Sequence, residues 1–528
     1  MTRLLYQIHR WVGIALALFM VTWFLSGLVI MYAPSSALGR ADQLARAESL
    51  RPESGWLSLG EAWQRSAAQR ATPDEGKKPG LPAEARLVRQ GGEGRWLVDD
   101  SKGKRHALSA SDGRLVDTSV EQATRIVRAW IATDAADAAV RYIDTGIQDS
   151  AVRNHEALRP FHRFAVGEGS REVLVSARSG EVVRDSTRLD RALYWTGNWI
   201  HLLRPLETAG LSADTRRTVL TWLGFFAFAS ALTGLIIGWQ RWRPGWGGRP
   251  TYSQGRTQPY REFWVKWHFW AGLLGGTFAL LWAFSGYLNG NPFKLFSPAT
   301  ASREEAARYQ GSDLPAAMRD WRPSAFVTDS ENKAIVELVW RRLGDQTVLL
   351  GLTRDGERQP QPVDSAERHI DEAALLTAAR RLAGSLPLAG HTLLTEYDSY
   401  YYARHGQGLV DRPLPVLQVD IADEGATRLY LDPQDGRLLL RQDTSRRVYR
   451  WVWSAIHHWD FAWLRHRPLW DAWMLTWVLM GVALGVSSVV IGWKRLKKTV
   501  KPSSKARPRP ATPSSNAPRP LAADGQTS

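Results

Sequence analysis

The sequence contains no cysteine in 528 residues. Disulfide bonds, iron–sulfur clusters, thiolate-ligated haem and thiol redox chemistry are therefore excluded. The chain also lacks a GxGxxG motif after a predicted strand, a phosphate-binding loop and a flavodoxin-like region. Any redox activity would need a cofactor held by other side chains and an electron donor outside the chain.

The sequence has fewer acidic than basic residues: it contains 52 Asp and Glu and 68 Lys and Arg. Its formal net charge is therefore +16 at pH 7. The basic residues crowd next to apolar segments and into the C-terminal tail. This distribution is typical of membrane topology signals and of contact with anionic lipid. We therefore expect membrane lipid as a partner and no nucleic acid.

Four apolar runs are each long enough to cross a hydrocarbon layer of about 30 Å. They extend from Trp11 to Tyr32, from Val219 to Trp239, from Phe269 to Leu288 and from Trp473 to Trp493. The first run is longer than the apolar core of a signal peptide and has no small-residue cleavage site, so we expect it to remain as an anchor. The long segments after the first and third runs contain strand-like and helical patterns, which predict two α+β domains.

The first half of the chain recurs in the second. HRWVGIALALFMVTWFLSG, from His9 to Gly27, aligns with HFWAGLLGGTFALLWAFSG, from His268 to Gly286, at a constant shift of 259 residues. Ile200 and His201 align with Ile456 and His457 at a shift of 256. Two similar halves related by an axis along the membrane normal predict a pseudo-twofold four-helix bundle.

Excess Lys and Arg lie within a few residues of the membrane in three places: the N-terminus, the loop between the second and third runs, and the C-terminus. The positive-inside rule places these three segments in the cytoplasm. Both α+β domains then lie on the other side, which in a bacterium is the periplasm.

Four histidines border the apolar runs. His9 and His268 lie at the cytoplasmic ends of the first and third helices, and His201 and His457 lie near the periplasmic face. Histidine in or beside a membrane segment is costly and needs a polar or metal partner. Pseudo-symmetry would pair each histidine with its repeat mate and give two bis-imidazole sites, as in a transmembrane dihaem protein. The alternative is that these rings hydrogen-bond lipid headgroups.

The surroundings of these histidines suggest room for a flat group. Gly13 lies one helical turn from His9, and Gly272 one turn from His268. His458 follows His457 directly, and neighbours on a helix point about 100° apart, so only one of the two can bind a given metal. The repeat favours His457.

Three further residues are candidates for the same sites. Arg10 adjoins the inner site and could pair with an anionic group, although the positive-inside rule explains it equally well. Trp23 and Trp282 each lie fourteen residues after their histidine, inside an apolar run. They could pack between the two cofactor levels or simply belong to the core.

The paired HxWxG…SG helices, the LH- and HHW-containing segments, the TGLxxGW helix end and the DPQDGRLLL turn resemble the PepSY-associated transmembrane family. That family includes bacterial inner-membrane proteins tied to iron uptake, among them dihaem reductases of ferric siderophores. The resemblance implies two b-type haems bound by His9, His268, His201 and His457, with PepSY domains beside the periplasmic haem. The first half departs from the pattern, because ARSGEVV lacks Asp-Pro and His201 is not doubled.

The predicted organisation has eight parts. These are a transmembrane helix at residues 1–33, a periplasmic PepSY-like domain at 34–190, an aromatic interfacial segment with the second helix at 191–242, a cytoplasmic basic loop at 243–262, the third helix at 263–290, a second periplasmic PepSY-like domain at 291–446, another aromatic segment with the fourth helix at 447–496, and a disordered cytoplasmic tail at 497–528.

The resemblance implies an inner-membrane dihaem b oxidoreductase that reduces ferric siderophore in the periplasm and releases Fe(II). Electrons would come from the quinone pool or from a cytoplasmic flavoprotein. Aromatic and cationic side chains suit an anionic chelate, and one segment supplies both. Its residues are Tyr400, Tyr401, Tyr402, Arg404 and His405. The alternatives are a siderophore or peptide transporter, and a PepSY-type sensor or protease-regulating protein without haem.

Overall fold

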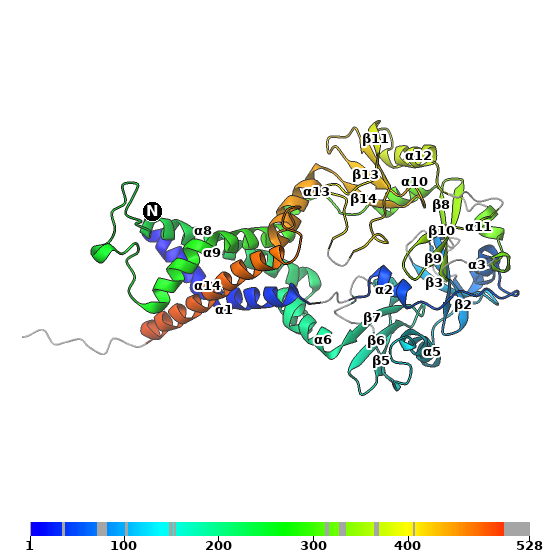
Figure 1. Cartoon of the computed structure of the whole chain (residues 1–528), viewed down its shortest axis with the longest axis horizontal. Helices are drawn as coiled ribbons and strands as arrows, with labels where there is room; N and C mark the ends of the chain where they lie inside the picture. The colour runs from blue at the N-terminus through cyan, green and yellow to red at the C-terminus, as the bar shows by residue number, and fades with distance from the viewer. Residues whose placement is uncertain are drawn as a thin grey trace, which may run out of the picture.

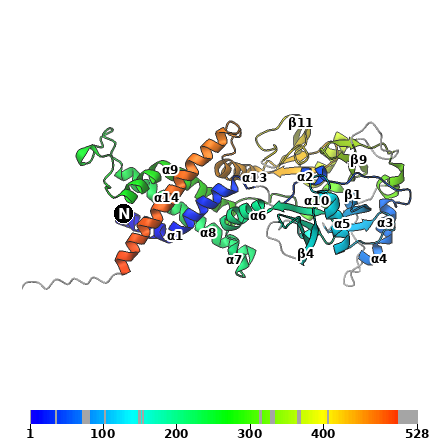
Figure 2. The ribbon, with the colours of Figure 1, turned by 60° about the horizontal axis from the view of Figure 1, so that its bottom comes forward.

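The computed structural model describes residues 2–33, 37–70, 82–100, 104–146, 152, 155–311, 316–326, 334–363, 369–404 and 407–500. A bundle of long helices forms one end of the molecule, and β-sheets with shorter helices form the other (Figures 1 and 2). We call the end of the bundle with the start of α1 and the end of α14 the terminal end, and the end joined to the sheets the domain end.

Within these described ranges, four helices are long and apolar enough to cross a membrane, so the chain is a multi-pass membrane protein. They are α1 (Thr2–Ile30), α8 (Ala213–Arg241), α9 (Phe263–Asn289) and α14 (Leu469–Val500). Residues 497–500 continue α14, so they are not part of a disordered tail as the sequence predicted. Lys497 and Lys498 favour this extension, because cations stabilise a helix C-terminus. The rest of the predicted tail, 501–528, lies outside the described residues.

The bundle is tightly packed because glycines let its helices approach. A Cβ atom on Gly485 would lie 2.9 Å from Cα of Val21, and one on Gly481 would lie 2.5 Å from the ring of Phe24. Both contacts join α14 to α1. Small residues have the same role at many membrane helix interfaces, where close backbone contact replaces hydrophobic burial as the source of stability.

A six-stranded antiparallel sheet has the order β10-β9-β8-β1-β2-β3. Its strands are β1 (Pro82–Gln90), β2 (Glu93–Asp100), β3 (Arg105–Ser109), β8 (Ile335–Leu343), β9 (Gln346–Thr353) and β10 (Arg358–Pro360). Strands β1 and β8 pair in the middle, with Leu87 opposite Leu338. The two predicted domains are therefore not separate, since each contributes three strands to one sheet. The reason is a shared core, in which Trp96 and Trp340 are both fully buried.

Each half also has a four-stranded antiparallel sheet of its own, in the orders β4-β5-β6-β7 and β11-β12-β13-β14. The strands are β4 (Val140–Gly146), β5 (Phe161–Val166), β6 (Arg171–Ser176), β7 (Val182–Thr187), β11 (Leu388–Leu394), β12 (Val416–Ile421), β13 (Arg428–Leu431) and β14 (Leu438–Gln442). Helix α5 (Val120–Ile131) packs its apolar side on the first sheet, and α12 (Glu372–Ala383) packs on the second. The α+β character predicted for these regions agrees with these sheets.

Both halves return to the membrane through the same order of elements. Helix α6 (Arg188–Tyr194) continues into a π-helix, η3 (Trp195–Trp199), and α13 (Thr444–Tyr449) continues into a π-helix, η7 (Arg450–His457). π-Helices are rare and are frequent at functional sites. The remaining helices are α2 (Arg40–Ala45), α3 (Leu59–Arg65), α4 (Ala67–Arg70), η2 (Glu156–Leu158), α7 (Pro205–Thr208), η4 (Ser253–Gly255), η5 (Pro292–Lys294), α10 (Arg303–Gln310), α11 (Ala316–Asp320) and η6 (Pro323–Ala325).

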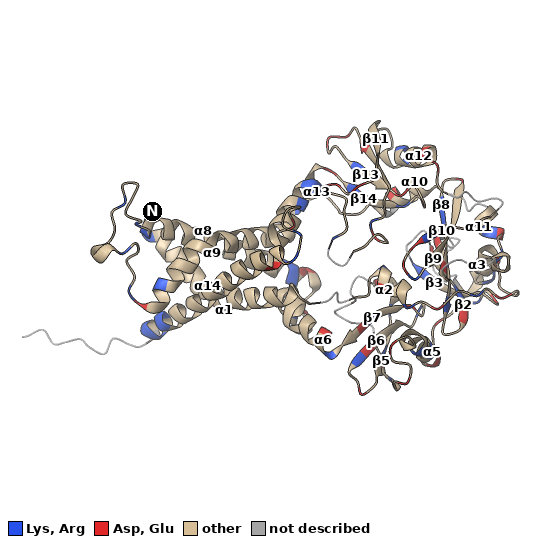
Figure 3. Ribbon diagram, in the orientation of Figure 1, with Lys and Arg blue, Asp and Glu red and all other residues tan. Residues whose placement is uncertain are grey.

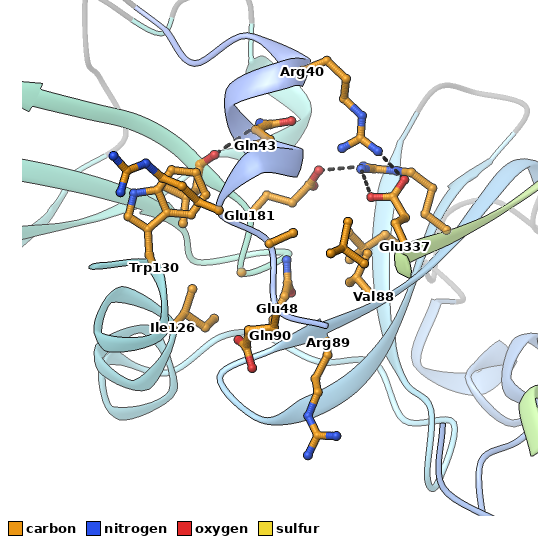
Figure 4. Close-up of a pocket in the computed structure, with 17 residues that line it drawn as sticks. Arg40, Gln43, Glu48, Val88, Arg89, Gln90, Ile126, Trp130, Glu181 and Glu337 are labelled. Carbon is orange, nitrogen blue, oxygen red and sulfur yellow. Dashed lines mark hydrogen bonds and ion pairs between the residues drawn. The ribbon is translucent and has the colours of Figure 1, made fainter. Parts of the chain in front are cut away.

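Buried ion pairs join the two halves beside a small cavity of about 80 Å³ (Figure 4). Arg86 of β1 donates to Glu181 at 2.6 Å and lies 3.6 Å from Glu337 of β8, which also pairs with Arg40. Burial would raise the pKa of the Glu181 carboxyl, but Arg105 and Arg86 outweigh this and hold its pKa well below the usual range. The carboxylate is therefore ionised at neutral pH.

Candidate functional site

Two histidines face each other at the terminal end of the bundle. His9 of α1 and His268 of α9, which we call the terminal pair, have ring centroids 6.2 Å apart and ring planes at 47°. Nδ1 of His9 lies 3.0 Å from the backbone oxygen of Ser230. Because a carbonyl oxygen only accepts, Nδ1 carries the proton and Nε2 of His9 keeps its lone pair.

Helix α14 orients the ring of His268. Nδ1 of His268 lies 3.2 Å from Oγ of Ser487 and 3.3 Å from Oγ of Ser488. Both hydroxyls donate their own proton to the backbone oxygen of Leu484. They therefore accept from the Nδ1–H of His268, and its Nε2 also keeps a lone pair.

Two further histidines, which we call the domain pair, lie at the domain end. His201 follows η3, and its Nδ1 is 3.1 Å from Oγ of Ser26 on α1. His457 ends η7, and its Nδ1 is 2.9 Å from Oγ of Ser285 on α9. Each serine donates its own proton to a backbone oxygen of its helix. The serines therefore accept from Nδ1–H, as Ser487 does in the terminal pair.

All four rings are thus held in the tautomer that binds metal ions through Nε2. Metal-binding histidines usually donate their second ring N–H to a fixed acceptor, which orients the ring. Burial lowers the pKa of His201 to about 4 and lowers the pKa of His457 as well. Both domain-pair rings are therefore neutral at pH 7, as metal binding requires.

The serines are site residues that the sequence analysis did not assign. Ser26 and Ser285 are identical in the two copies of the repeat, and this identity was the available signal. Ser26 lies 17 residues after His9 on the same helix. At 1.5 Å per residue the two pairs are therefore about 25 Å apart along the bundle.

A cavity of about 350 Å³ lies between the helices at the terminal pair, and His9 and His268 both line it. Seven of the described lining residues are glycines, and Gly13 and Gly272 are among them. A Cβ atom on either of these two would meet its nearest neighbour only at 3.6 or 3.5 Å. Both distances are ordinary van der Waals contacts, so the space beside the two histidines is the cavity itself. That this space takes a flat group remains a prediction.

Gly234 of α8 is a further site residue that the sequence did not single out. A Cβ atom there would lie 2.6 Å from Cε1 of His9. The glycine therefore fixes how closely the His9 ring can pack against α8.

Trp23 and Trp282 lie beside the histidines of the domain pair, not midway between the terminal pair and the domain pair. The ring of Trp23 is 5.5 Å from that of His201. The indole N–H of Trp282 donates to the backbone oxygen of His457 at 3.0 Å. Both side chains therefore pack against the segments that carry the domain-pair histidines.

His457 and His458 have different surroundings. His457 is packed between Ser285 and Trp453, whose ring stacks on it at 4.2 Å. His458 is exposed. The position of His457 favours it over His458 as the bundle-facing ligand. Arg10, the other candidate near these sites, lines the cavity at the terminal pair.

The proposed chelate-binding tyrosines are mostly packing residues. Tyr401 is fully buried and stacks on Tyr430 with centroids 5.2 Å apart. Tyr402 is also buried, and its hydroxyl donates to Asp460. The prediction that these two contact substrate is therefore wrong, because their rings complete the core under the loop.

Arg404 is exposed, and Tyr400 is half-buried. Of the residues predicted to bind a chelate, these two are therefore still accessible to a ligand. His405 lies outside the described residues.

The donor set fits haem better than a bare metal ion. Each pair supplies two imidazoles with Nε2 free, and the part of the chain that the structure describes has no group of three or more His, Asp or Glu able to hold a metal. A structural zinc site needs four protein ligands. Haem iron needs only axial ligands from the protein, and two histidines supply both.

Comparison with protein-family models matches residues 6–351 to the PepSY-associated TM region. A comparison with curated proteins gave no significant match. The matched range covers more than half of the chain and includes most of α1, all of α8 and α9, and three of the four histidines. This protein belongs to the PepSY-associated transmembrane family.

Proposed function

We propose that this protein is a dihaem b oxidoreductase of the bacterial inner membrane. It passes electrons across the membrane, reduces ferric siderophore in the periplasm and releases Fe(II). The observation that carries this proposal is the presence of two histidine pairs, held by serines and a backbone oxygen with Nε2 available, at opposite ends of one bundle.

His9 and His268 would hold one haem, and His201 and His457 the other. When bound, such a group would supply one-electron chemistry. The chain contributes the orientation of the rings and an apolar surrounding. In the terminal pair, Gly234 and Ser230 set the position of His9.

A pseudo-twofold relation between the halves supports two equivalent sites. Ser26 and Ser285 hold their histidines in the same way and are repeat mates. The central sheet has three strands from each half, and the domain-pair histidine lies at the end of a π-helix or two residues after it in each half. The axis would run along the bundle, as in membrane proteins built from parallel repeats.

Charge supports the orientation of the protein. Lys and Arg gather at the terminal end of the bundle (Figure 3). Arg10 of α1, Arg241 of α8 and Arg495 of α14 lie toward this end of their helices. The positive-inside rule then places both chain ends in the cytoplasm and the sheets in the periplasm. The terminal pair would receive electrons from the quinone pool or from a cytoplasmic flavoprotein, because the sequence offers no flavin or nicotinamide motif of its own.

Iron release follows from reduction, since hard oxygen donors hold Fe(III) much more tightly than Fe(II). One electron from the protein converts the bound Fe(III) to Fe(II), and the chelate then lets it go. The loop that carries Arg404 is tied to η7, because Tyr402 donates to Asp460 and Arg450 donates to the Ser399 oxygen at 2.9 Å. A chelate held at this loop would therefore lie near the domain pair.

The test is an absorption spectrum of the purified protein followed by a reaction. We expect a sharp Soret band, and we expect reduced protein to be reoxidised by anaerobic ferric siderophore with one Fe(II) formed per electron. Colourless protein would refute the proposal and leave the transporter or sensor alternatives. A haem spectrum without reoxidation by several ferric chelates would refute the assigned substrate class.

A further inference from the structure

The cavity at the terminal pair has polar and cationic side chains at its terminal end. Tyr6 and Arg10 of α1 line its terminal end. At the repeat shift of 259 residues their counterparts are Val265 and Phe269 of α9, which line the cavity as well. At these two positions α1 therefore presents polar side chains and α9 presents apolar ones, so the two helices differ in the chemistry that they offer to an occupant of the cavity.

Arg495 of α14 is a second cation at this end. Helices α1 and α14 contact each other at Ile14 and Gly492, where a Cβ on the glycine would lie 3.5 Å from Ile14. Arg10 is four residues from Ile14 and Arg495 is three residues from Gly492, both toward the terminal end. Residues three or four apart share a helix face. Arg10 and Arg495 therefore lie at the same level on neighbouring helices.

Neither guanidinium has a counter-ion. Among the described residues, the side chains of Arg10 and Arg495 make no ion pair and no hydrogen bond. Nearby cations are engaged: Lys494 pairs with Glu262 at 2.6 Å, and Arg241, the repeat mate of Arg495, donates to the Tyr6 hydroxyl at 2.6 Å. Two unpaired cations at one edge of an apolar cavity favour an anionic partner.

We propose that Arg10 and Arg495 bind the two propionate carboxylates of the haem at the terminal pair. The cavity then takes a flat apolar group whose two acids lie on one edge, facing the cytoplasm. This inference rests on the proposed function and deepens it, because it fixes the orientation of the group and assigns Arg495 a role. Guanidinium groups suit carboxylates, since they offer two parallel N–H donors.

The experiment uses the full chain in detergent, depleted of haem, and titrates it with haemin and with haemin dimethyl ester, whose carboxylates are blocked. We expect the terminal site of the wild-type protein to prefer the free acid by about 100-fold, since each charge-assisted contact contributes about ten-fold in affinity. Arg10→Gln and Arg495→Gln should each lower haemin affinity about ten-fold, and the double variant should bind acid and ester equally. Arg10→Lys with Arg495→Lys should restore part of the preference.

Lys494→Gln is the matched control, because it removes one positive charge beside Arg495 from a side chain that does not line the cavity. It should bind haemin as the wild-type protein does. The spectrum of each variant as purified, before haem is removed, reports through the haem at the domain pair whether the variant is folded. Equal binding of acid and ester by the wild-type protein, or unchanged affinity in the double variant, would overturn the inference while leaving the proposed function intact. A wild-type chain that binds no haem would instead refute the proposed function.

Discussion

The imidazole rings of His9 and His268 lie with their centroids 6.2 Å apart, although 259 residues separate them in the chain. A bond between a metal ion and imidazole nitrogen is about 2 Å long, so two rings bound to one ion from opposite sides have centroids about 6 Å apart. The apolar helices α1 and α9 thus hold the terminal pair at a spacing that suits a shared metal centre. Five measurements follow from this arrangement and from the fold around it.

The first prediction concerns stoichiometry. We expect two b-type haems per chain, because in both histidine pairs each ring has its Nδ1 hydrogen-bonded and its Nε2 free. A pyridine haemochrome assay against protein concentration measures this ratio. A ratio near one would mean that only one pair binds haem.

The second prediction concerns topology. Alkaline phosphatase fused after Glu48 or Gly311 should be active, because both positions lie in the domains that we place in the periplasm. Fusions after Gln254 or at the C-terminus should be inactive, since the basic residues there stay in the cytoplasm. An active fusion at Gln254 would reverse the direction of electron flow.

The third prediction separates the two pairs. His268→Ala should remove or alter the haem at the terminal pair and block reduction of the other haem by a cytoplasmic or quinone donor. His457→Ala should leave a haem that is still reduced but cannot pass electrons to ferric siderophore.

Spectra of each variant, recorded after reduction and again after addition of ferric siderophore, measure this difference. His458→Ala is the control and should behave as the wild-type protein. If His457→Ala keeps both haems and full reoxidation while His458→Ala does not, His458 is the ligand.

The fourth prediction concerns Gly234. In Gly234→Ala the new methyl group would lie 2.6 Å from Cε1 of His9, so the ring must move. We expect a changed spectrum or loss of the haem at the terminal pair and an unchanged signal from the domain pair. Gly390→Ala in β11 is the control, because a Cβ there would meet no heavy atom within 4 Å and the residue lies outside the bundle. Identical spectra for both variants would show that Gly234 does not position His9.

The fifth prediction concerns acid stability. The folded protein holds the pKa of Glu181 below its unfolded value of about 4.3. The ion pairs of this carboxylate therefore stabilise the protein above that pH, and the stabilisation is lost as the pH falls toward the folded pKa. Glu181→Gln should cost about 3 kcal/mol at pH 7, as for other broken buried pairs, and should flatten the acid dependence.

Chemical unfolding followed by tryptophan fluorescence, at pH values from neutral to acidic, tests this fifth prediction. Glu156→Gln is the control, because Glu156 is exposed and pairs only at the surface with Arg159. It should change stability by less than about 1 kcal/mol. Equal effects of the two variants would contradict the assigned role of Glu181.

Local sequence patterns predicted the membrane helices and the family of this protein. The four membrane helices follow from apolar runs longer than a bilayer requires, and the family follows from repeated motifs such as the one that begins at His9 and again at His268. Both predictions are confirmed. They depend on residues close together in the chain, where composition and periodicity carry the signal.

Other features depend on residues far apart in the chain. The pairing of β1 with β8, the serines that orient the histidines, and the position of Arg495 beside Arg10 all join segments more than 150 residues apart. Local periodicity cannot encode such contacts, because they are chosen by how the elements pack. The burial of Tyr401 and Tyr402 has the same origin, since only the folded domain determines which rings complete its core and which remain exposed.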